Sequence, residues 1–274
     1  MNTIKGKSVL ITGAGRGIGK RLAMGFAAEG ALVGLLARSQ AEIELAKLEI
    51  EQANGTAMCL RADVRNPIEL AHAVERLRSK FGGLDVLIAA AAVQGPIGPF
   101  LTSKPTAWNE TVETNLIGAA NSCRVALPPM IEKRSGKIIL LAGGGSAYSR
   151  PNFTAYAASK SALVRFGETL ADEVRDANVQ VNTIAPGAAY STMTDEILQA
   201  GEERAGRKEI EDAEKVRVTG GIPAEKQTAL ALFLASEVSN HISGKLIHVN
   251  DDWKRFEQDN MKAELYTLRR VQKM

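Results

Sequence analysis

Two side chains that can move a proton lie four residues apart in the second half of the chain. Tyr156 and Lys160 belong to the run Tyr-Ala-Ala-Ser-Lys, within residues 154–175, where apolar residues recur at helical spacing. Side chains four residues apart leave a helix on the same face. A free phenol has a pKa of about 10, and a nearby ammonium favours its ionised form. We therefore predict that Lys160 lowers the Tyr156 pKa, so that the tyrosine acts as a general acid or base.

A glycine-rich turn near the N-terminus could hold a partner for that chemistry. Gly13, Gly17 and Gly19 follow an apolar run and precede a helical pattern. Glycines allow a tight turn there, so backbone N–H groups and a helix N-terminus can approach a pyrophosphate. A lone glycine-rich turn is weak evidence, but this one lies between a strand and a helix, as a dinucleotide site requires.

The end of the second predicted strand, residues 31–37, indicates which dinucleotide binds. An acidic residue there would bind a ribose 2′-hydroxyl, whereas a cation would pair with a 2′-phosphate. Arg38 occupies this position, and Arg16 lies in the glycine turn. Two cations without a carboxylate favour NADP(H) over NAD(H), although Arg38 could also be a solvated strand end.

The elements that must position these residues alternate along the chain. The apolar runs are nearly continuous, as is typical of strands buried on both faces of a parallel sheet. Long helical patterns fill the gaps between them. We predict the α/β class: a single-domain doubly wound parallel sheet, or Rossmann fold, with helices on both faces. The predicted strands are residues 8–12, 31–37, 56–60, 85–89, 137–142, 179–185 and 245–249, and the main helical patterns are 105–132, 154–175 and 224–235.

The same reading divides the chain into regions. Residues 1–252 are expected to form the dinucleotide-binding and catalytic domain, and 253–274 a C-terminal extension that docks on the body or is disordered. The charged segment 202–212 predicts either a solvated surface helix or part of a lid over the substrate, which we place at 190–220.

Composition excludes several classes of protein. The chain has 274 residues, 45% of them hydrophobic and 24% charged, with a net charge of +3 spread over both signs. No basic run marks a nucleic-acid site, and no apolar run approaches the roughly 20 residues that span a bilayer. Without an apolar signal segment, we expect a cytoplasmic protein that binds neither nucleic acid nor membrane. No metal site is predicted.

With these motifs in this order, the chain resembles the short-chain dehydrogenase/reductase family from about residue 5 to 250. The resemblance implies that the tyrosine exchanges a proton with the substrate oxygen while the lysine holds the nicotinamide ribose. It implies that Asn115 helps to hold a proton-relay water, and that two long helices pair in a homotetramer or homodimer. The predicted cofactor contacts are Gly13, Arg16, Gly17, Ile18, Gly19, Arg38, Asp63, Val64, Ala90, Tyr156, Lys160, Pro186, Gly187, Ala189, Ser191 and Met193.

One departure from the family pattern bears on catalysis. The usual catalytic serine lies thirteen residues before the tyrosine, and Gly143 stands there. Loss of such a donor costs about 100- to 1000-fold in turnover if nothing replaces it. Ser146, a backbone N–H, a water molecule or a substrate hydroxyl could substitute, and Ser146 could equally be an ordinary loop serine. A second departure, four alanines at 89–92 in place of Asn-Asn-Ala-Gly, is expected to change packing only.

The favoured function is an NADP(H)-dependent oxidoreductase acting on a secondary alcohol or ketone. The alternatives are an epimerase or dehydratase that uses bound cofactor without net redox change, and an NADP-binding sensor or scaffold with impaired catalysis. Polar residues expected around the cleft favour a sugar, cyclitol or nucleotide sugar as substrate. They are Tyr148, Arg150, Asn152, Tyr190, Asp251 and Asp252.

Overall fold

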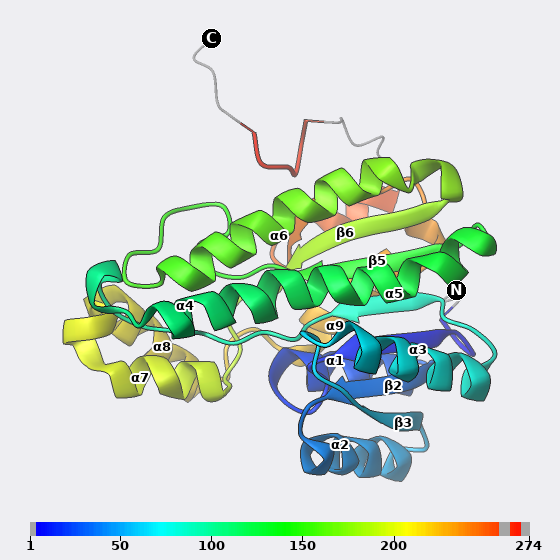
Figure 1. Ribbon diagram of the computed structural model, residues 1–274, viewed down its shortest axis with the longest axis horizontal. Coiled ribbons are helices and arrows are strands. Elements are labelled where there is room, and N and C mark those ends of the chain that lie inside the picture. Colours follow the sequence, from blue (N-terminus) through cyan, green and yellow to red (C-terminus); the bar gives the residue numbers. More distant parts are fainter. Residues whose placement is uncertain (1–3, 258–263, 270–274) are drawn as a thin grey trace.

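A seven-stranded, wholly parallel sheet forms the centre of the molecule (Figure 1). The computed structural model describes residues 4–257 and 264–269. The strand order β3-β2-β1-β4-β5-β6-β7 is that of a doubly wound sheet. The predicted strands and fold class are therefore confirmed, with strand ends shifted by no more than one residue. The strands are β1 (Ser8–Thr12), β2 (Leu32–Ala37), β3 (Thr56–Arg61), β4 (Val86–Ala89), β5 (Gly136–Leu141), β6 (Val179–Ala185) and β7 (Leu246–His248).

Helices cover both faces of the sheet, as predicted. One core cluster joins the sheet to α1 (Gly17–Ala28), α2 (Gln40–Gln52) and α9 (Ala224–Ala235). A second joins the opposite face to α3 (Pro67–Phe81), α5 and α6. The predicted helix 105–132 is one continuous rod made of α4, a π-helical turn and α5. These last elements are α4 (Pro105–Val112), the π turn Glu113–Ile117, α5 (Gly118–Glu132) and α6 (Thr154–Glu173).

Parallel strands bring the segments that follow them to one edge of the sheet. The chain reverses its direction of winding between β1 and β4, which are neighbours in the sheet. In such sheets a crevice opens at this point, outside the carboxyl ends of the strands. The glycine turn after β1, Arg38 after β2 and the alanines after β4 therefore lie around one site.

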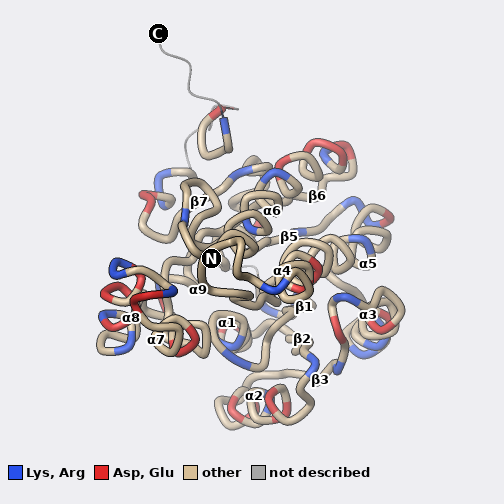
Figure 2. Tube along the Cα trace, turned by 60° about the vertical axis from the view of Figure 1, so that its left-hand side comes forward, with Lys and Arg blue, Asp and Glu red and all other residues tan. Residues whose placement is uncertain are grey.

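Two further helices lie beyond the end of the sheet (Figure 1). They are α7 (Thr192–Ala205) and α8 (Arg207–Thr219), which pack on each other and fall within the predicted lid at 190–220. Figure 2 shows charged residues of both signs along this pair. Short 3-10 turns occur at Phe100–Thr102, Arg175–Ala177, Glu237–Ser239 and Trp253–Glu257.

The beginning of the C-terminal extension is attached to the body. Trp253 stacks against Phe233 of α9 at 5.2 Å between ring centroids, and Phe256 is buried. Farther on, the Tyr266 carbonyl accepts a hydrogen bond from the Leu246 N–H of the last strand. Residues 258–263 and 270–274 of the predicted extension lie outside the described residues.

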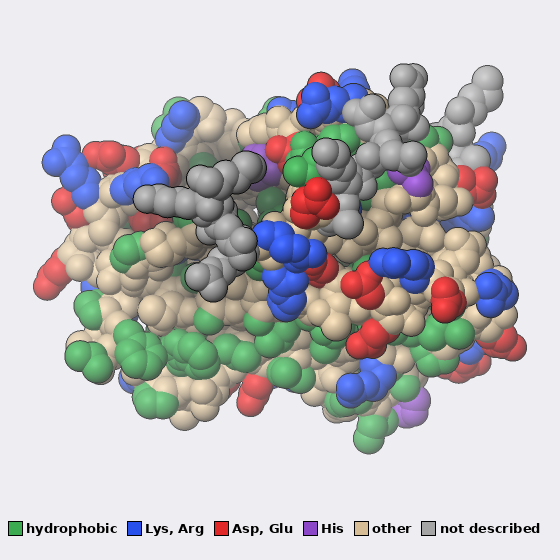
Figure 3. Space-filling view, turned by 90° about the horizontal axis from the view of Figure 1, so that it is seen from above, with side chains coloured by type: hydrophobic (Ala, Val, Ile, Leu, Met, Phe, Trp, Pro, Cys, Tyr) green, Lys and Arg blue, Asp and Glu red, His purple; other side chains and the backbone are tan. Residues whose placement is uncertain are grey.

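The surface is mixed in character. Seen from above, hydrophobic side chains form a band along one edge, and charges of both signs are spread over the remainder (Figure 3). No helix among the described residues is long and apolar enough to cross a membrane.

Candidate active site

The glycine turn forms one end of the site. Gly13 has a φ of +67°, and a Cβ built on it would lie 2.7 Å from the Ala91 Cα. A Cβ on Gly19 would lie only 2.2 Å from the Gly13 carbonyl oxygen. Side chains are therefore excluded from both positions, and the turn can deliver the N-terminus of α1 to the crevice. This is a cradle for a pyrophosphate, so the residues fit a dinucleotide cofactor.

The turn is tied to the loop after β4. The Thr12 hydroxyl oxygen accepts hydrogen bonds from the backbone N–H groups of Ala90 and Ala91, both at 3.1 Å. The segment that stands where the family usually has Asn-Asn-Ala-Gly is thus held to β1 through its backbone, which is consistent with the expected change in packing alone.

A cleft of about 510 Å³ runs from this turn to the predicted acid/base pair. It gathers most of the residues that the sequence predicts for the cofactor. Gly187 and Ala189 are not among its lining residues: Gly187 lies in the next loop against Ile222, and Ala189 pairs with Gly221. The predicted residues that line the cleft are Gly13, Arg16, Gly17, Ile18, Gly19, Arg38, Asp63, Val64, Ala90, Tyr156, Lys160, Pro186, Ser191 and Met193.

Charged side chains cluster at the end of the cleft near β2. Arg38 is exposed, and no hydrogen bond or ion pair engages its side chain within the described part of the chain. Arg16 lies 3.5 Å from the Glu42 carboxylate, which sequence reasoning did not include in the site. Asp63 is held by Arg65 through three side-chain contacts, and this hydrogen bonding lowers the pKa of its carboxyl group.

Tyr156 and Lys160 lie at the other end of the cleft, on the first turns of α6, and both are buried. The Lys160 Nζ donates a hydrogen bond to the Leu141 carbonyl oxygen at 2.7 Å and lies 5.8 Å from the centroid of the tyrosine ring. Burial lowers the pKa of Lys160 to about 8. Both residues line the same cleft.

The predicted direction of the tyrosine pKa is wrong for this arrangement. Burial raises the pKa of Tyr156, and the Arg150 guanidinium opposes this rise only in part. Desolvation penalises the phenolate more than the cations around it favour it. The phenol is therefore protonated at neutral pH.

Gly143 lies directly beside the tyrosine hydroxyl. A Cβ built on Gly143 would come within 2.4 Å of the Tyr156 Oη. Ser146, the proposed substitute for the missing serine, is buried, and its N–H donates to the Gly143 carbonyl in a tight turn. Ser146 is not among the residues that line the cleft. Its catalytic role remains a prediction that this position does not support.

Asn115 braces the site from behind. It lies in the π turn and is fully buried. Its Oδ1 accepts from the Val93 N–H, and its Nδ2 donates both to the Val93 carbonyl and to the Ser159 hydroxyl. Both N–H donors of the side chain are therefore used in joining the loop after β4 to α6. The proton-relay role of Asn115 stays a prediction.

Comparison with known proteins decides the family. The sequence model described as "short chain dehydrogenase" matches residues 7–202. The chain belongs to the short-chain dehydrogenase family. It is 32% identical over 251 residues to the 3-oxoacyl-[acyl-carrier-protein] reductase FabG of Staphylococcus aureus, covering 89% of this chain and 96% of that protein. It is 33% identical over 253 residues to the oxidoreductase UcpA of Escherichia coli, covering 89% and 93% of the two chains.

Solved structures agree with this assignment. The crystal structure of levodione reductase superposes with a TM-score of 0.82 at 25% identity, covering 92% of this chain and 98% of the other. NAD⁺-bound xylitol dehydrogenase has a TM-score of 0.80 at 23% identity, covering 90% and 98% of the two chains, and shows the fold alone. This short-chain dehydrogenase is thus an oxidoreductase of the class that acts on CH–OH groups.

In this short-chain dehydrogenase, α7 and α8 pack beside the end of the cleft that holds Tyr156. A cluster of buried apolar side chains from these helices, including Ile197, Ala205 and Ala213, packs with Tyr156 and Phe153. The helices are also held by polar contacts. The Arg204 guanidinium donates to the Ile97 carbonyl oxygen at 2.7 Å.

A bidentate ion pair joins α8 to the loop before α6. Arg150 donates to both carboxylate oxygens of Glu209, at 2.9 and 2.7 Å. The same guanidinium lies 3.9 Å from the centroid of the Phe153 ring. This arrangement fixes α8 against the segment that precedes Tyr156.

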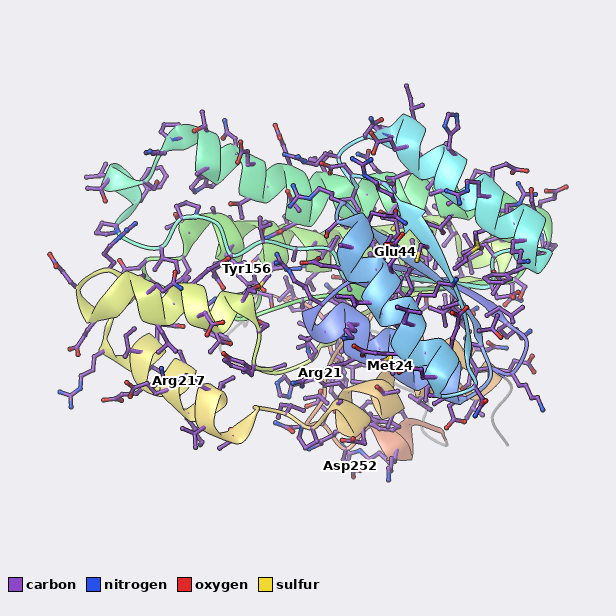
Figure 4. All side chains as sticks on the ribbon, turned by 90° about the horizontal axis from the view of Figure 1, so that it is seen from below. Arg21, Met24, Glu44, Tyr156, Arg217 and Asp252 are labelled. Carbon is purple, nitrogen blue, oxygen red and sulfur yellow. The ribbon has the colours of Figure 1, made fainter. Side chains whose placement is uncertain are left out.

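None of the polar side chains expected around the substrate lines the cleft, although the Arg150 guanidinium lies 5.6 Å from the centroid of the Tyr156 ring. Arg150 is engaged by Glu209, and Tyr190 donates its hydroxyl to Asp195 at 3.0 Å. The Asp251 carboxylate accepts from the His248 N–H. Asp252 lies across the molecule from Tyr156 (Figure 4). On the side of α7, the cleft is lined by Ser191, Thr192, Met193 and Glu196.

Glu42, Gln94 and Glu196 are among the polar residues that line the cleft and that sequence reasoning missed. Glu42 is in the first turn of α2, close to the predicted Arg38 position, and its charge was a detectable signal. Burial raises the pKa of the Glu196 carboxyl on α7. Gln94 had no local signal, because its burial depends on packing between distant segments.

Proposed function

We propose that this short-chain dehydrogenase is an NADP(H)-dependent oxidoreductase that transfers hydride between nicotinamide and a secondary alcohol or ketone. The observation that carries the proposal is the single cleft that has the glycine turn at one end and Tyr156 with Lys160 at the other. Its length and lining suit an extended dinucleotide that presents its reactive ring to the tyrosine.

The proposed preference for NADP(H) rests on charge at the β2 end. Arg38 is exposed at the cleft with no ion-pair partner among the described residues, and β2 ends without a carboxylate. An unpaired guanidinium is suited to a 2′-phosphate, because it can donate two parallel hydrogen bonds. Glu42 is the opposing feature, since its carboxylate pairs with Arg16 and would repel a phosphate.

The proposed acid/base residue is Tyr156. Its raised pKa keeps the phenol protonated near neutrality, which is the form that donates a proton to a ketone oxygen. Reduction is therefore the direction that these residues favour. A bound nicotinamide would supply the hydride. Lys160, cationic below a pH of about 8, would hold the ribose and stabilise the phenolate left by proton transfer.

The proposed substrate remains a sugar, cyclitol or nucleotide sugar. On the side of α7 the cleft presents Thr192, Met193 and Glu196, so this flank offers hydroxyl and carboxylate groups beside an apolar side chain. Hydroxyls of a substrate can hydrogen-bond to such groups, whereas a wholly apolar substrate would leave them unpaired.

The test is turnover with a matched pair of tyrosine variants. Purified protein would be assayed by nicotinamide absorbance with NADPH or NADH and a panel of ketoses, cyclitol ketones, nucleotide sugars, 3-oxoacyl thioesters and cyclic ketones. Tyr156→Phe should lower turnover at least 100-fold and leave NADPH binding within about threefold. Tyr266→Phe is the control and should be unchanged, because this tyrosine packs on Phe256 and does not line the cleft.

Other outcomes identify the alternatives. Retained turnover in Tyr156→Phe would refute the tyrosine mechanism. Product formation without net change of the cofactor would indicate an epimerase or dehydratase. Tight NADPH binding without conversion of any substrate would indicate a sensor or scaffold.

The assembly and the cytoplasmic location stay predictions. Two exposed apolar side chains support helix pairing into a homodimer or homotetramer. Ile117 and Ile131 lie on the rod of α4 and α5, and each is more than 40% exposed. Sedimentation of the full chain would give the oligomer number.

A further inference from the structure

Gln94, on the loop after β4, has an unsatisfied amide. Its side chain is only 3% exposed, and its Nε2 has no hydrogen-bond partner in the part of the chain that the structure describes. Nearly all buried polar groups in folded proteins are hydrogen-bonded, because an unpaired donor carries the full cost of desolvation. A buried amide that lines a cleft and lacks a partner is suited to a ligand atom.

The backbone on both sides of Gln94 is fixed. Val93 is held through its N–H and its carbonyl by the Asn115 side chain, at 2.8 and 3.0 Å. Gly95 has a φ of +71°, and a Cβ on it would lie 2.1 Å from the Thr111 Oγ1. The backbone therefore holds the Gln94 amide in position before any ligand binds, and the loop cannot easily shift to bring the amide to another hydrogen-bond partner.

Gln94 lies on the same loop as Ala90, which is predicted to contact the cofactor. The loop runs from Ala90 toward Thr111 and α4. Gln94 shares the cleft with Tyr156, whose hydroxyl is proposed to meet the reacting oxygen. As a neutral amide with an unused donor, Gln94 can supply the hydrogen bond that a substrate oxygen loses when it leaves water.

We propose that the Gln94 Nε2 donates a hydrogen bond to a second oxygen of the substrate, distinct from the reacting carbonyl oxygen. The enzyme would thereby select ketones that carry a further hydroxyl or carbonyl group over otherwise identical ketones. This inference rests on the proposed function and names a substrate feature for that same site. A site built to bind an oxygen rejects the analogue that lacks it, because the protein donor is then left unpaired.

The test compares two ketones that differ by one oxygen. Wild-type protein and Gln94→Met, which keeps the length of the side chain without its donors, would be assayed with NADPH on 2-hydroxycyclohexanone and cyclohexanone. The wild type should prefer the hydroxyketone. The variant should lose about 10- to 100-fold in kcat/KM for the hydroxyketone and less than threefold for cyclohexanone. Gln94→Glu, which loses the donors and keeps acceptors, should lose the same preference.

Three results would overturn the inference. Equal losses on both ketones would show that the amide only braces the loop, and a weaker NADPH affinity in Gln94→Met would assign it to the cofactor. If the wild type had the same kcat/KM for the two ketones, the proposed selection for a second oxygen would be refuted. Failure of the proposed function is distinguishable, because wild-type protein would then bind NADPH and reduce no ketone of the panel, and the inference would fall with it.

Discussion

The Tyr156 hydroxyl occupies the space that a side chain at Gly143 would need. A Cβ on Gly143 would lie 2.4 Å from the tyrosine Oη and 2.8 Å from its Cε1, closer than real Cβ contacts occur. Only a residue without a side chain fits at this position unless the tyrosine moves. Gly143 is matched to a tyrosine that packs against the backbone of the loop, and the two residues depend on each other.

Restoring the serine should accordingly harm this enzyme. We expect Gly143→Ser to lower kcat at least tenfold and the free energy of unfolding by about 1–3 kcal/mol, because the tyrosine must move to admit a Cβ. Gly143→Ala should do the same, since the Cβ and not the hydroxyl causes the effect. The measurements are kcat and urea unfolding for both variants.

The neighbouring glycine supplies the control for this prediction. A Cβ on Gly144 would meet its nearest atom, the Tyr148 hydroxyl oxygen, at 3.4 Å, which is ordinary contact. Gly144→Ala should therefore keep its activity. A Gly143→Ser enzyme that is faster than the wild type and equally stable would show that the tyrosine moves at no cost.

The preference for NADPH over NADH should depend on Arg38 and Glu42 in opposite directions. Arg38→Ala should weaken NADPH binding about 10- to 100-fold, the value of charge-assisted hydrogen bonds, and change NADH binding little. Glu42→Gln should tighten NADPH binding about threefold, because it frees Arg16 from an exposed and therefore weak ion pair. Fluorescence titrations at fixed ionic strength measure both dissociation constants.

A carboxylate farther along α2 provides the comparison for Glu42. Glu49 pairs with Lys20 and is not among the cleft residues. Glu49→Gln should leave NADPH affinity unchanged. If both variants gained the same NADPH affinity, the gain would come from the change in net charge alone. If the wild type bound NADH more tightly than NADPH, the proposed preference would be refuted.

What the sequence predicted follows from local physical signals. Continuous apolar runs mark strands buried on both faces, so the predicted strands were correct to within one residue at each end. The glycine turn directly follows the first strand, and Arg38 directly follows the second. Because parallel strands end at the same edge of the sheet, the topology alone placed both around one site.

What the sequence did not predict depends on distant contacts. The Tyr156 pKa is governed by burial beneath α7 and α8, which no nearby residue signals. The charge of these helices predicted a solvated surface helix or a lid, yet Ala205 and Ala213 are buried. The Arg150–Glu209 pair joins residues 59 positions apart. Packing of this kind is set by the whole fold.

A buried lysine away from the site should make stability depend on pH. Lys137 of β5 is 7% exposed, and its Nζ donates to the Ser239 hydroxyl at 3.3 Å. Burial lowers its pKa from 10.5 to about 8, with the Glu237 carboxylate opposing the shift. Below a pH of about 8 both the folded and the unfolded chain carry this proton, and the folded state has the full cost of a buried charge.

The sign of the effect follows from proton binding. Between about pH 8 and 10.5 the unfolded chain keeps the proton and the folded chain does not, so this cost falls as the pH rises. Lys137→Met should be more stable than the wild type by roughly 1–3 kcal/mol at pH 7, and the difference should shrink toward pH 10. Urea unfolding at a series of pH values measures it. A difference that is constant with pH would show that Lys137 titrates normally.

The ion pair between Arg150 and Glu209 should hold α8 over the cleft. Both side chains are at most one quarter exposed, and the contact is bidentate, which makes it stronger than a surface pair. We expect Glu209→Gln to raise the substrate KM about 3- to 10-fold and to speed trypsin cleavage within α8.

Glu211 on the same helix provides a control. It pairs with Arg207, and the two side chains are 61% and 79% exposed. Glu211→Gln should change KM less than twofold, since exposed pairs contribute little. Equal effects of the two substitutions would mean that α8 responds to charge alone, and unchanged KM and proteolysis in Glu209→Gln would show that the apolar cluster holds the helix without the ion pair.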